Sequence, residues 1–156
     1  MKDLWPEDEL VRYAKPYLKE RGFKKKKKKR WLKDTGEFTV SFLIQGSIFS
    51  KNDYYIRPGI YINSLLPENP NYYGHWFLEI KRDDPEAVMG CFTKWAEEWT
   101  NKPLIKERLL AFLEWEERNP LEKRRANQVD YAADPVPSRE FFTVNSKVRQ
   151  YILDTF

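Results

Sequence analysis

The sequence has few of the residues that build metal sites and disulfides. Its 156 residues include one cysteine, Cys91, and one histidine, His75. A lone cysteine cannot form an intramolecular disulfide, and one cysteine with one histidine does not give the ligand spacing of a zinc site. We therefore expect no metal and no cofactor. Cys91 lies at helical spacing from apolar residues, so we expect it to be a small buried residue of a helix.

Glycine-rich loops and long hydrophobic runs are also missing. The six glycines are scattered and form no phosphate-binding motif. The longest uncharged stretch, residues 38–50, is too short and too polar to span a membrane. The acidic segment 3–9 differs from the basic start of a signal peptide. These features predict a cytoplasmic protein with no membrane partner.

Residues suited to catalysis are equally sparse. His75 follows Gly74 at the start of an expected strand, where an exposed surface histidine is more common than a general base. The nearby carboxylates, Asp83, Asp84 and Glu86, fit the charged first turn of a helix better than an acid and base pair. We therefore expect no catalytic residues and no enzymatic activity. An enzyme of unknown reaction is the third and least supported functional hypothesis, after the two binding functions given below.

Basic charge is abundant at one place. Seven consecutive cations begin at Lys24 and end at Arg30. Residues 24–33 hold eight basic residues and no acid, so the remainder of the chain has a net charge of −4 against +4 for the whole. Such a patch can bind an acidic protein or phosphates. Alternatively, lysines on an edge strand only prevent sheets from aggregating.

The spacing at which apolar residues recur changes along the chain, from that of a helix to that of a strand and back to that of a helix. Residues 7–21 predict an amphipathic helix that Pro16 kinks or splits and that Gly22 ends in a left-handed conformation. Alternating segments then predict four strands, at residues 24–32, 38–45, 55–63 and 75–80. Helical spacing returns after Asp84, after Asn101 and near residue 145. Asp84 and Asn101 are suitable helix caps, and either Asn145 or Ser146 can cap the last helix. The expected fold class is α+β: a four-stranded antiparallel meander in one domain, 1–156, with the N-terminal helix and the C-terminal helices packed on one face.

The alternation assigns two faces to this sheet. Residues expected against the helices are apolar: Val40, Phe42, Ile60, Ile62, Leu78 and Ile80. Residues expected on the exposed face are polar or aromatic: Ser41, Gln45, Tyr55, Arg57, Tyr61, Asn63, His75 and Glu79. Large planar side chains that form hydrogen bonds are typical of recognition surfaces, although antiparallel sheets also commonly leave one polar face to water.

Several short motifs resemble the bacterial domain-of-unknown-function 4304 family. They are the Gly-Phe-Lys-Lys that follows the first helix at Gly22, the Gln-Gly-Ser at Gln45, and the Gly-Ile-Tyr at Gly59, within about residues 10–65. The resemblance implies an α+β fold and a bacterial cytoplasmic setting, but no activity. Scattered members resemble immunity proteins that accompany secreted toxins. Gly22 and Gly59 are expected to meet backbone requirements, and Gln45 either pairs with the backbone near Ser47 or belongs to a site beside Arg57.

Two binding functions remain. The first is a non-catalytic protein-binding module, immunity-like, that binds an acidic protein partner. Its expected contact residues are Gln45, Arg57, Tyr61 and His75 on the sheet face, with Lys25 and Lys27 from the basic run. The second is a nucleic-acid-binding protein that uses the basic run. In a strand the lysines alternate between two faces, and the acidic remainder repels a duplex, so we favour the protein partner.

Overall fold

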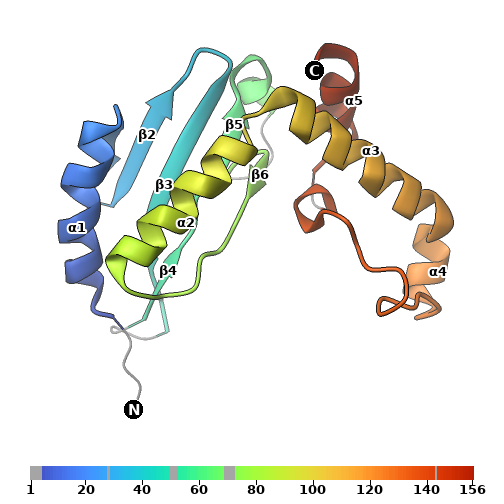
Figure 1. Cartoon of the computed structure of the whole chain (residues 1–156), viewed down its shortest axis with the longest axis horizontal. Helices are drawn as coiled ribbons and strands as arrows, with labels where there is room; N and C mark the ends of the chain where they lie inside the picture. Colours follow the sequence, from blue (N-terminus) through green and yellow to red (C-terminus); the bar gives the residue numbers. More distant parts are fainter. Residues whose placement is uncertain (1–4, 28, 50–52, 69–72, 143) are drawn as a thin grey trace. The chain divides into compact units, whose positions relative to one another are not determined.

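The computed structural model describes residues 5–27, 29–49, 53–68, 73–142 and 144–156. The chain divides into two compact units, Met1–Thr100 and Asn101–Phe156 (Figure 1). We describe each unit by itself, and the expectation of one domain stays a prediction.

The first unit contains an antiparallel sheet and two α-helices, which confirms the α+β class. The helices are α1 (Glu7–Glu20) and α2 (Pro85–Glu98). The sheet has six strands rather than the four expected: β1 (Lys24–Lys27), β2 (Arg30–Asp34), β3 (Phe38–Gly46), β4 (Tyr54–Ile56), β5 (Gly59–Ile62) and β6 (Trp76–Phe77). A 3₁₀ helix, η1 (Asn63–Glu68), follows β5.

The two additional strands have separate causes. The expected strand 24–32 is wrong because the lysine run folds back on itself, so that β1 pairs with β2 as an antiparallel hairpin. The expected strand 55–63 is divided at Arg57 and Pro58 into β4 and β5. Proline has no amide proton for the sheet ladder, which accounts for the interruption. Lys28 lies outside the described residues.

The neighbours in the sheet follow the order of the chain. The order is β1-β2-β3-β5-β6, and β4 pairs with the far end of β3 (Figure 1). β3 pairs with β2 on one side and with β5 and then β4 on the other. β1 is therefore an edge strand, and the nine-residue β3 is the central one.

The helices α1 and α2 cover one face of the sheet (Figure 1). Phe42 of β3 meets Phe92 of α2 with ring centroids 4.8 Å apart, and Trp31 of β2 lies beside Phe42. The expected inward residues Val40, Phe42, Ile60, Ile62 and Ile80 are buried, while Leu78 is half-buried. The prediction of this face is therefore confirmed for all but Leu78.

Helix α1 continues through Pro16. The helix is not split, because it runs without interruption from Glu7 to Glu20, and the expected kink stays a prediction. Its buried residues Leu10, Ala14 and Leu18 lie on both sides of the proline. The helix ends as predicted, because Gly22 has a φ of 88° and the amide of Phe23 donates to the carbonyl of Leu18 over 3.0 Å.

The second unit is helical. It contains α3 (Lys102–Arg118), α4 (Leu121–Arg125), the 3₁₀ helix η2 (Arg139–Phe142) and α5 (Ser146–Thr155). The predicted caps are confirmed: the side chains of Asn101 and Asn145 accept from the amides of Leu104 and Val148. The core of the unit is largely aromatic and includes the fully buried Phe112, Trp115 and Phe141.

Candidate functional site

A β-bulge decides how the basic run presents its charges. Lys25 pairs with Trp31, but Lys27 pairs with Arg30, so Lys26 is an extra residue in β1. Directly opposed residues of an antiparallel pair lie on the same side of the sheet. Because of the bulge, Lys27 lies on the side of Arg30, whereas Lys25 lies on the other side with Trp31. Lys24, paired with Leu32, is also on the side of Arg30. We call Lys24, Lys27 and Arg30 the basic side.

The side chains of this hairpin differ in their surroundings. All four lysines of β1 are exposed. The ammonium group of Lys25 lies 5.8 Å from the ring centre of Trp31, and that of Lys29 pairs with Glu7 over 2.6 Å. Arg30 is half-buried and reaches across the sheet, where it donates to the hydroxyl of Tyr61 over 2.7 Å. The expected contact residues Lys25 and Lys27 are therefore on opposite sides.

Arg57 is the centre of a polar and aromatic cluster on the sheet face away from the helices. Its guanidinium donates to Gln45 Oε1 over 2.6 Å and to the Tyr73 hydroxyl over 3.0 Å, and it pairs with Glu79 over 3.0 Å. The same group lies 4.5 Å from the ring centre of Tyr55. The structure thus brings the predicted residues Gln45 and Arg57 together, with Tyr73 as an addition from a loop.

Tyr61 and His75 are buried, so their expected exposure is wrong. Their side chains are 6% and 4% exposed. Arg30 covers Tyr61, and the ring of His75 meets Tyr61 edge-on at 6.1 Å. Ser41, also expected to be exposed, is buried and accepts from Arg30 over 3.3 Å. On this part of the face, protein side chains such as Arg30 cover the sheet and exclude solvent.

His75 has a structural role. Its Nδ1 accepts from the amide of Ile62 over 2.8 Å, so Nε2 carries the proton of the neutral ring. Nε2 has no hydrogen-bond partner among the described residues. Burial lowers the pKa of His75, and the backbone of Leu65 opposes this shift without reversing it. A neutral histidine that supports strand β5 matches this geometry.

Gln45 belongs to the Arg57 cluster rather than to the strand backbone. Of the two roles expected for it, the structure has the second, because its Oε1 accepts from both Arg57 and Tyr73. Ser47 instead accepts from the amide of Phe49 with its own hydroxyl. Asn63, expected on the same face, is held by Thr39 and Asp34 near the opposite end of β3.

Metal-ligating and nucleophilic side chains are sparse among the described residues. They contain no group of three or more histidine, cysteine, aspartate or glutamate side chains that could hold a metal ion. Cys91 is exposed on α2, so the expectation that it is buried is wrong. It lies on the outer side of a helix whose buried residues include Val88, Met89, Phe92 and Trp95. No helix in these ranges has the length and apolar character needed to cross a bilayer.

Two residues of this face were not predicted. The sequence predicts Arg30 only as the end of the basic run. In the sheet, Arg30 of β2 lies one strand from Ser41 of β3 and two strands from Tyr61 of β5, and it contacts both side chains. Tyr73 lies in a loop, where the spacing of apolar residues does not indicate the direction of a side chain. Gly59, which has no side chain, leaves room for the Tyr73 carbonyl.

The fold and this face define an α+β protein with an antiparallel sheet that is covered by helices on one side and by its own arginine and tyrosine side chains on part of the other. Comparison with known proteins gives the family. The model of the domain of unknown function DUF4304 matches residues 14–106, and the chain belongs to this family. No curated protein and no solved structure matches the chain.

Proposed function

We propose that this chain is a non-catalytic protein-binding module that recognises an acidic surface of another protein through the basic side. The observation that carries this proposal is the position of Lys24 and Lys27 on the same side of the hairpin as Arg30, which the pairing of β1 with β2 and the bulge at Lys26 set. Clustered charges of one sign steer a partner of opposite charge and set its orientation.

The Arg57 cluster supports the same partner. It lies on the same side of the sheet as Arg30, since Arg30 pairs with Leu43 and Gln45 lies two residues further along β3. Tyr55 is 36% exposed and stacks on Arg57. Tyrosine and arginine are the residues that most often dominate binding energy when a partner covers them. The lysines would attract the acidic protein, and Tyr55 with Arg57 would supply contact area.

The setting is part of the proposal. A bacterial cytoplasmic location and an immunity-like role, in which the partner is a toxin, are supported by the family resemblance. Expression of the chain together with a toxin encoded beside it would test this role. Survival of cells that carry both, but not of cells that carry the toxin with the Lys27→Glu variant, is the expected result.

Binding itself is tested by two variants that carry the same charge change on the same strand. Partners captured from the native host by the wild-type chain are purified and titrated by calorimetry against Lys27→Glu and Lys25→Glu. We expect Lys27→Glu to weaken binding by about tenfold and Lys25→Glu by less than about twofold. Equal effects of the two variants, or capture that is lost on nuclease treatment, would contradict the proposal.

Nucleic-acid binding is the second candidate, and the four exposed lysines of β1 favour it. We expect weak binding that is indifferent to sequence, with an affinity that falls steeply between roughly 50 and 200 mM salt as counterions are released. Fluorescence anisotropy with labelled single-stranded RNA and DNA measures this. Sub-micromolar, sequence-selective binding at physiological salt would replace the protein partner with a nucleic acid.

A further inference from the structure

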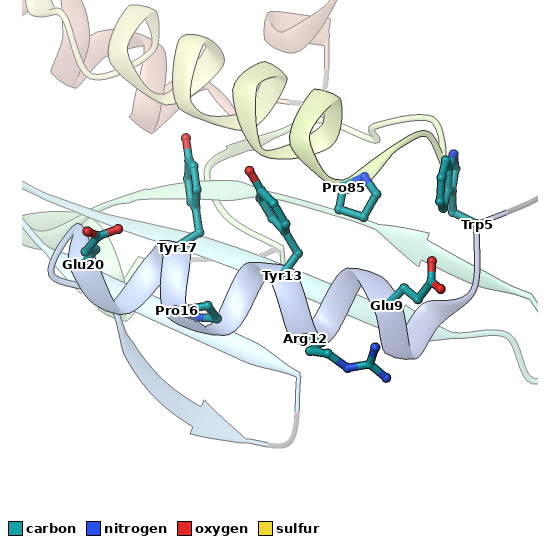
Figure 2. A pocket seen from close by; sticks show the side chains of 8 residues that line it. All are labelled: Trp5, Glu9, Arg12, Tyr13, Pro16, Tyr17, Glu20 and Pro85. Atoms are coloured by element: carbon teal, nitrogen blue, oxygen red, sulfur yellow. The ribbon is translucent and has the colours of Figure 1, made fainter.

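The surface of α1 carries a second feature, of opposite charge to the basic side. A groove of about 570 Å³ lies along α1 and reaches the start of α2 (Figure 2). We call it the aromatic groove. It is lined by three aromatic residues, two prolines and three charged residues: Trp5, Tyr13, Tyr17, Pro16, Pro85, Glu9, Arg12 and Glu20. Its volume falls within the range of about 300–1,000 Å³ that is typical of ligand sites.

The aromatic rings of the groove are fixed and only partly covered. Tyr13 and Tyr17 stack with centroids 6.0 Å apart and an interplanar angle of 28°. The hydroxyl of Tyr17 is held by Thr93 of α2 over 2.7 Å, so this ring cannot swing away. Trp5 and Tyr13 remain 40% and 38% exposed, and Figure 2 shows them on either side of Pro85.

One guanidinium already occupies part of this stack. Arg21 lies over the Tyr17 ring with its central carbon 3.5 Å from the ring centre, and it also donates to the Tyr17 carbonyl. The arrangement shows which group these rings accept, because the negative face of an aromatic ring attracts a planar cation. The exposed rings of Tyr13 and Trp5 offer the same chemistry to a group from outside.

The charges beside the groove are mainly acidic. Glu9 and Glu20 line it from α1, and one oxygen of Glu20 lies 3.7 Å from the Arg21 guanidinium. The exposed Asp84 and Glu86 flank Pro85 at the start of α2. Arg12 lies 3.9 Å from Asp8, one turn earlier on α1, so its charge is directed in part to that carboxylate. Carboxylates next to aromatic rings complement a guanidinium, which forms two parallel hydrogen bonds with one carboxylate.

We propose that the aromatic groove binds an arginine-bearing extended segment of a partner protein. The arginines stack on Tyr13 and Trp5 and pair with Glu9 and Glu20, while Pro16 and Pro85 contact the segment between them. The groove is open and longer than one side chain, which favours a peptide over a free small cation. This site is independent of the basic side, so the chain would offer two faces of opposite charge to other proteins.

The probe is a six-residue peptide with two arginines among glycines, compared with the same peptide in which citrulline replaces arginine. Citrulline keeps the planar shape and removes the charge. Calorimetric titration of the full chain is expected to give saturable binding of the arginine peptide below about 1 mM and none of the citrulline peptide. Failure of the arginine peptide to bind, or equal binding of the two peptides, overturns the proposal.

Variants locate the peptide. Tyr13→Ala and the double variant Glu9→Gln with Glu20→Gln are each expected to weaken arginine-peptide binding by about tenfold. The matched controls are Tyr131→Ala, at a tyrosine of the second unit that is 50% exposed, and Glu107→Gln with Glu117→Gln, at exposed positions of α3. Thermal unfolding confirms that each variant is folded.

Two outcomes would overturn the proposal: the peptide binds at another site, or the aromatic groove binds a second copy of the chain. Full affinity of Tyr13→Ala removes the aromatic groove as the site. Sedimentation of the peptide-free chain tests the other occupant, a second copy whose basic run enters the groove. A dimer that Tyr13→Ala dissociates overturns the arginine-bearing partner in favour of self-association.

Discussion

The backbone carbonyl of Tyr73 lies against Gly59, at a place where a side chain on residue 59 would overlap it. Gly59 begins β5, and Tyr73 lies shortly before β6 in the chain. Because Gly59 has no Cβ atom, the backbone of Tyr73 can lie against it, and the Tyr73 hydroxyl accepts a hydrogen bond from Arg57.

The substitution Gly59→Ala is expected to destabilise the protein by about 2 kcal/mol or more, because a backbone carbonyl must move to admit a methyl group. Urea unfolding followed by tryptophan fluorescence measures the free energy. Gly90→Ala is the control: residue 90 is exposed in α2 with nothing near the added methyl group, and alanine there should stabilise by roughly 0.5–1 kcal/mol. A neutral Gly59→Ala variant would show that the Tyr73 carbonyl does not lie against residue 59.

The apolar face of the sheet is tested by Phe42→Asp and Ile60→Asp. Both positions are fully buried, and an unpaired buried carboxylate costs several kcal/mol out of a total stability of only about 5–15 kcal/mol. We expect both variants to be unfolded in circular dichroism and thermal scans. Ile48→Asp, at a side chain that is 90% exposed, should change stability by less than about 0.5 kcal/mol. Unchanged melting of either buried variant would contradict the face assignment.

The hydrogen bond between Arg30 and Tyr61 contributes to the stability of the folded protein. Tyr61→Phe removes the hydroxyl that accepts from Arg30 over 2.7 Å and is expected to cost about 1–2 kcal/mol. A double-mutant cycle with Arg30→Met should give a coupling of at least about 0.5 kcal/mol, because each single change breaks the same contact. Tyr55→Phe, at an exposed ring on the same face, is the control and should be nearly neutral. Additive effects in the cycle would mean that the hydrogen bond is not formed in solution.

His75 makes the stability depend on pH. Burial lowers its pKa below the ordinary 6.5, so the folded protein binds fewer protons at this site than the unfolded chain. The stabilisation is complete above pH 6.5 and is lost as the pH falls from about 6.5 toward the lower pKa of the folded state. Urea unfolding between about pH 7.5 and 4.5 should show this loss in the wild type. In His75→Asn, Oδ1 can replace Nδ1 as the acceptor for the amide of Ile62. The unfolding free energy of this variant should therefore not show the loss that protonation of His75 causes in the wild type. Parallel curves for the two proteins would remove His75 as the cause.

The sequence predicted those parts of the fold that local chemistry decides. The alternation of apolar and polar residues around Phe42 and Ile60 predicted the buried face, and Gly22 predicted the end of α1. Both predictions depend only on residues that are neighbours in the sequence. The hairpin inside the lysine run was not predicted. It has no glycine, asparagine or proline at its turn to indicate a reversal, and its bulge at Lys26 appears only in the pairing with β2.

The candidate sites depend on contacts between distant residues, which the sequence does not reveal. Alternation placed Tyr61 and His75 on the correct side of the sheet, but it could not show that Arg30 covers that side. In the aromatic groove, the helical spacing of residues 7–21 predicts a helix but not what the ring of Tyr17 contacts. Its stacking with Tyr13 and Arg21, and the position of Trp5 ahead of the helix, became evident only from the structure.

The central position of β3 sets the order in which the sheet loses its protection from solvent. Its backbone is paired on both sides, with β2 along one edge and with β5 and β4 along the other, while the outward edge of β1 has no neighbouring strand among the described residues. In deuterated water, the amide protons of β3 should therefore exchange last and the outward amides of β1 first. The strand that carries the most charge would be the one whose backbone opens most readily, and a binding partner on that strand would register as slowed exchange there before any change reaches β3.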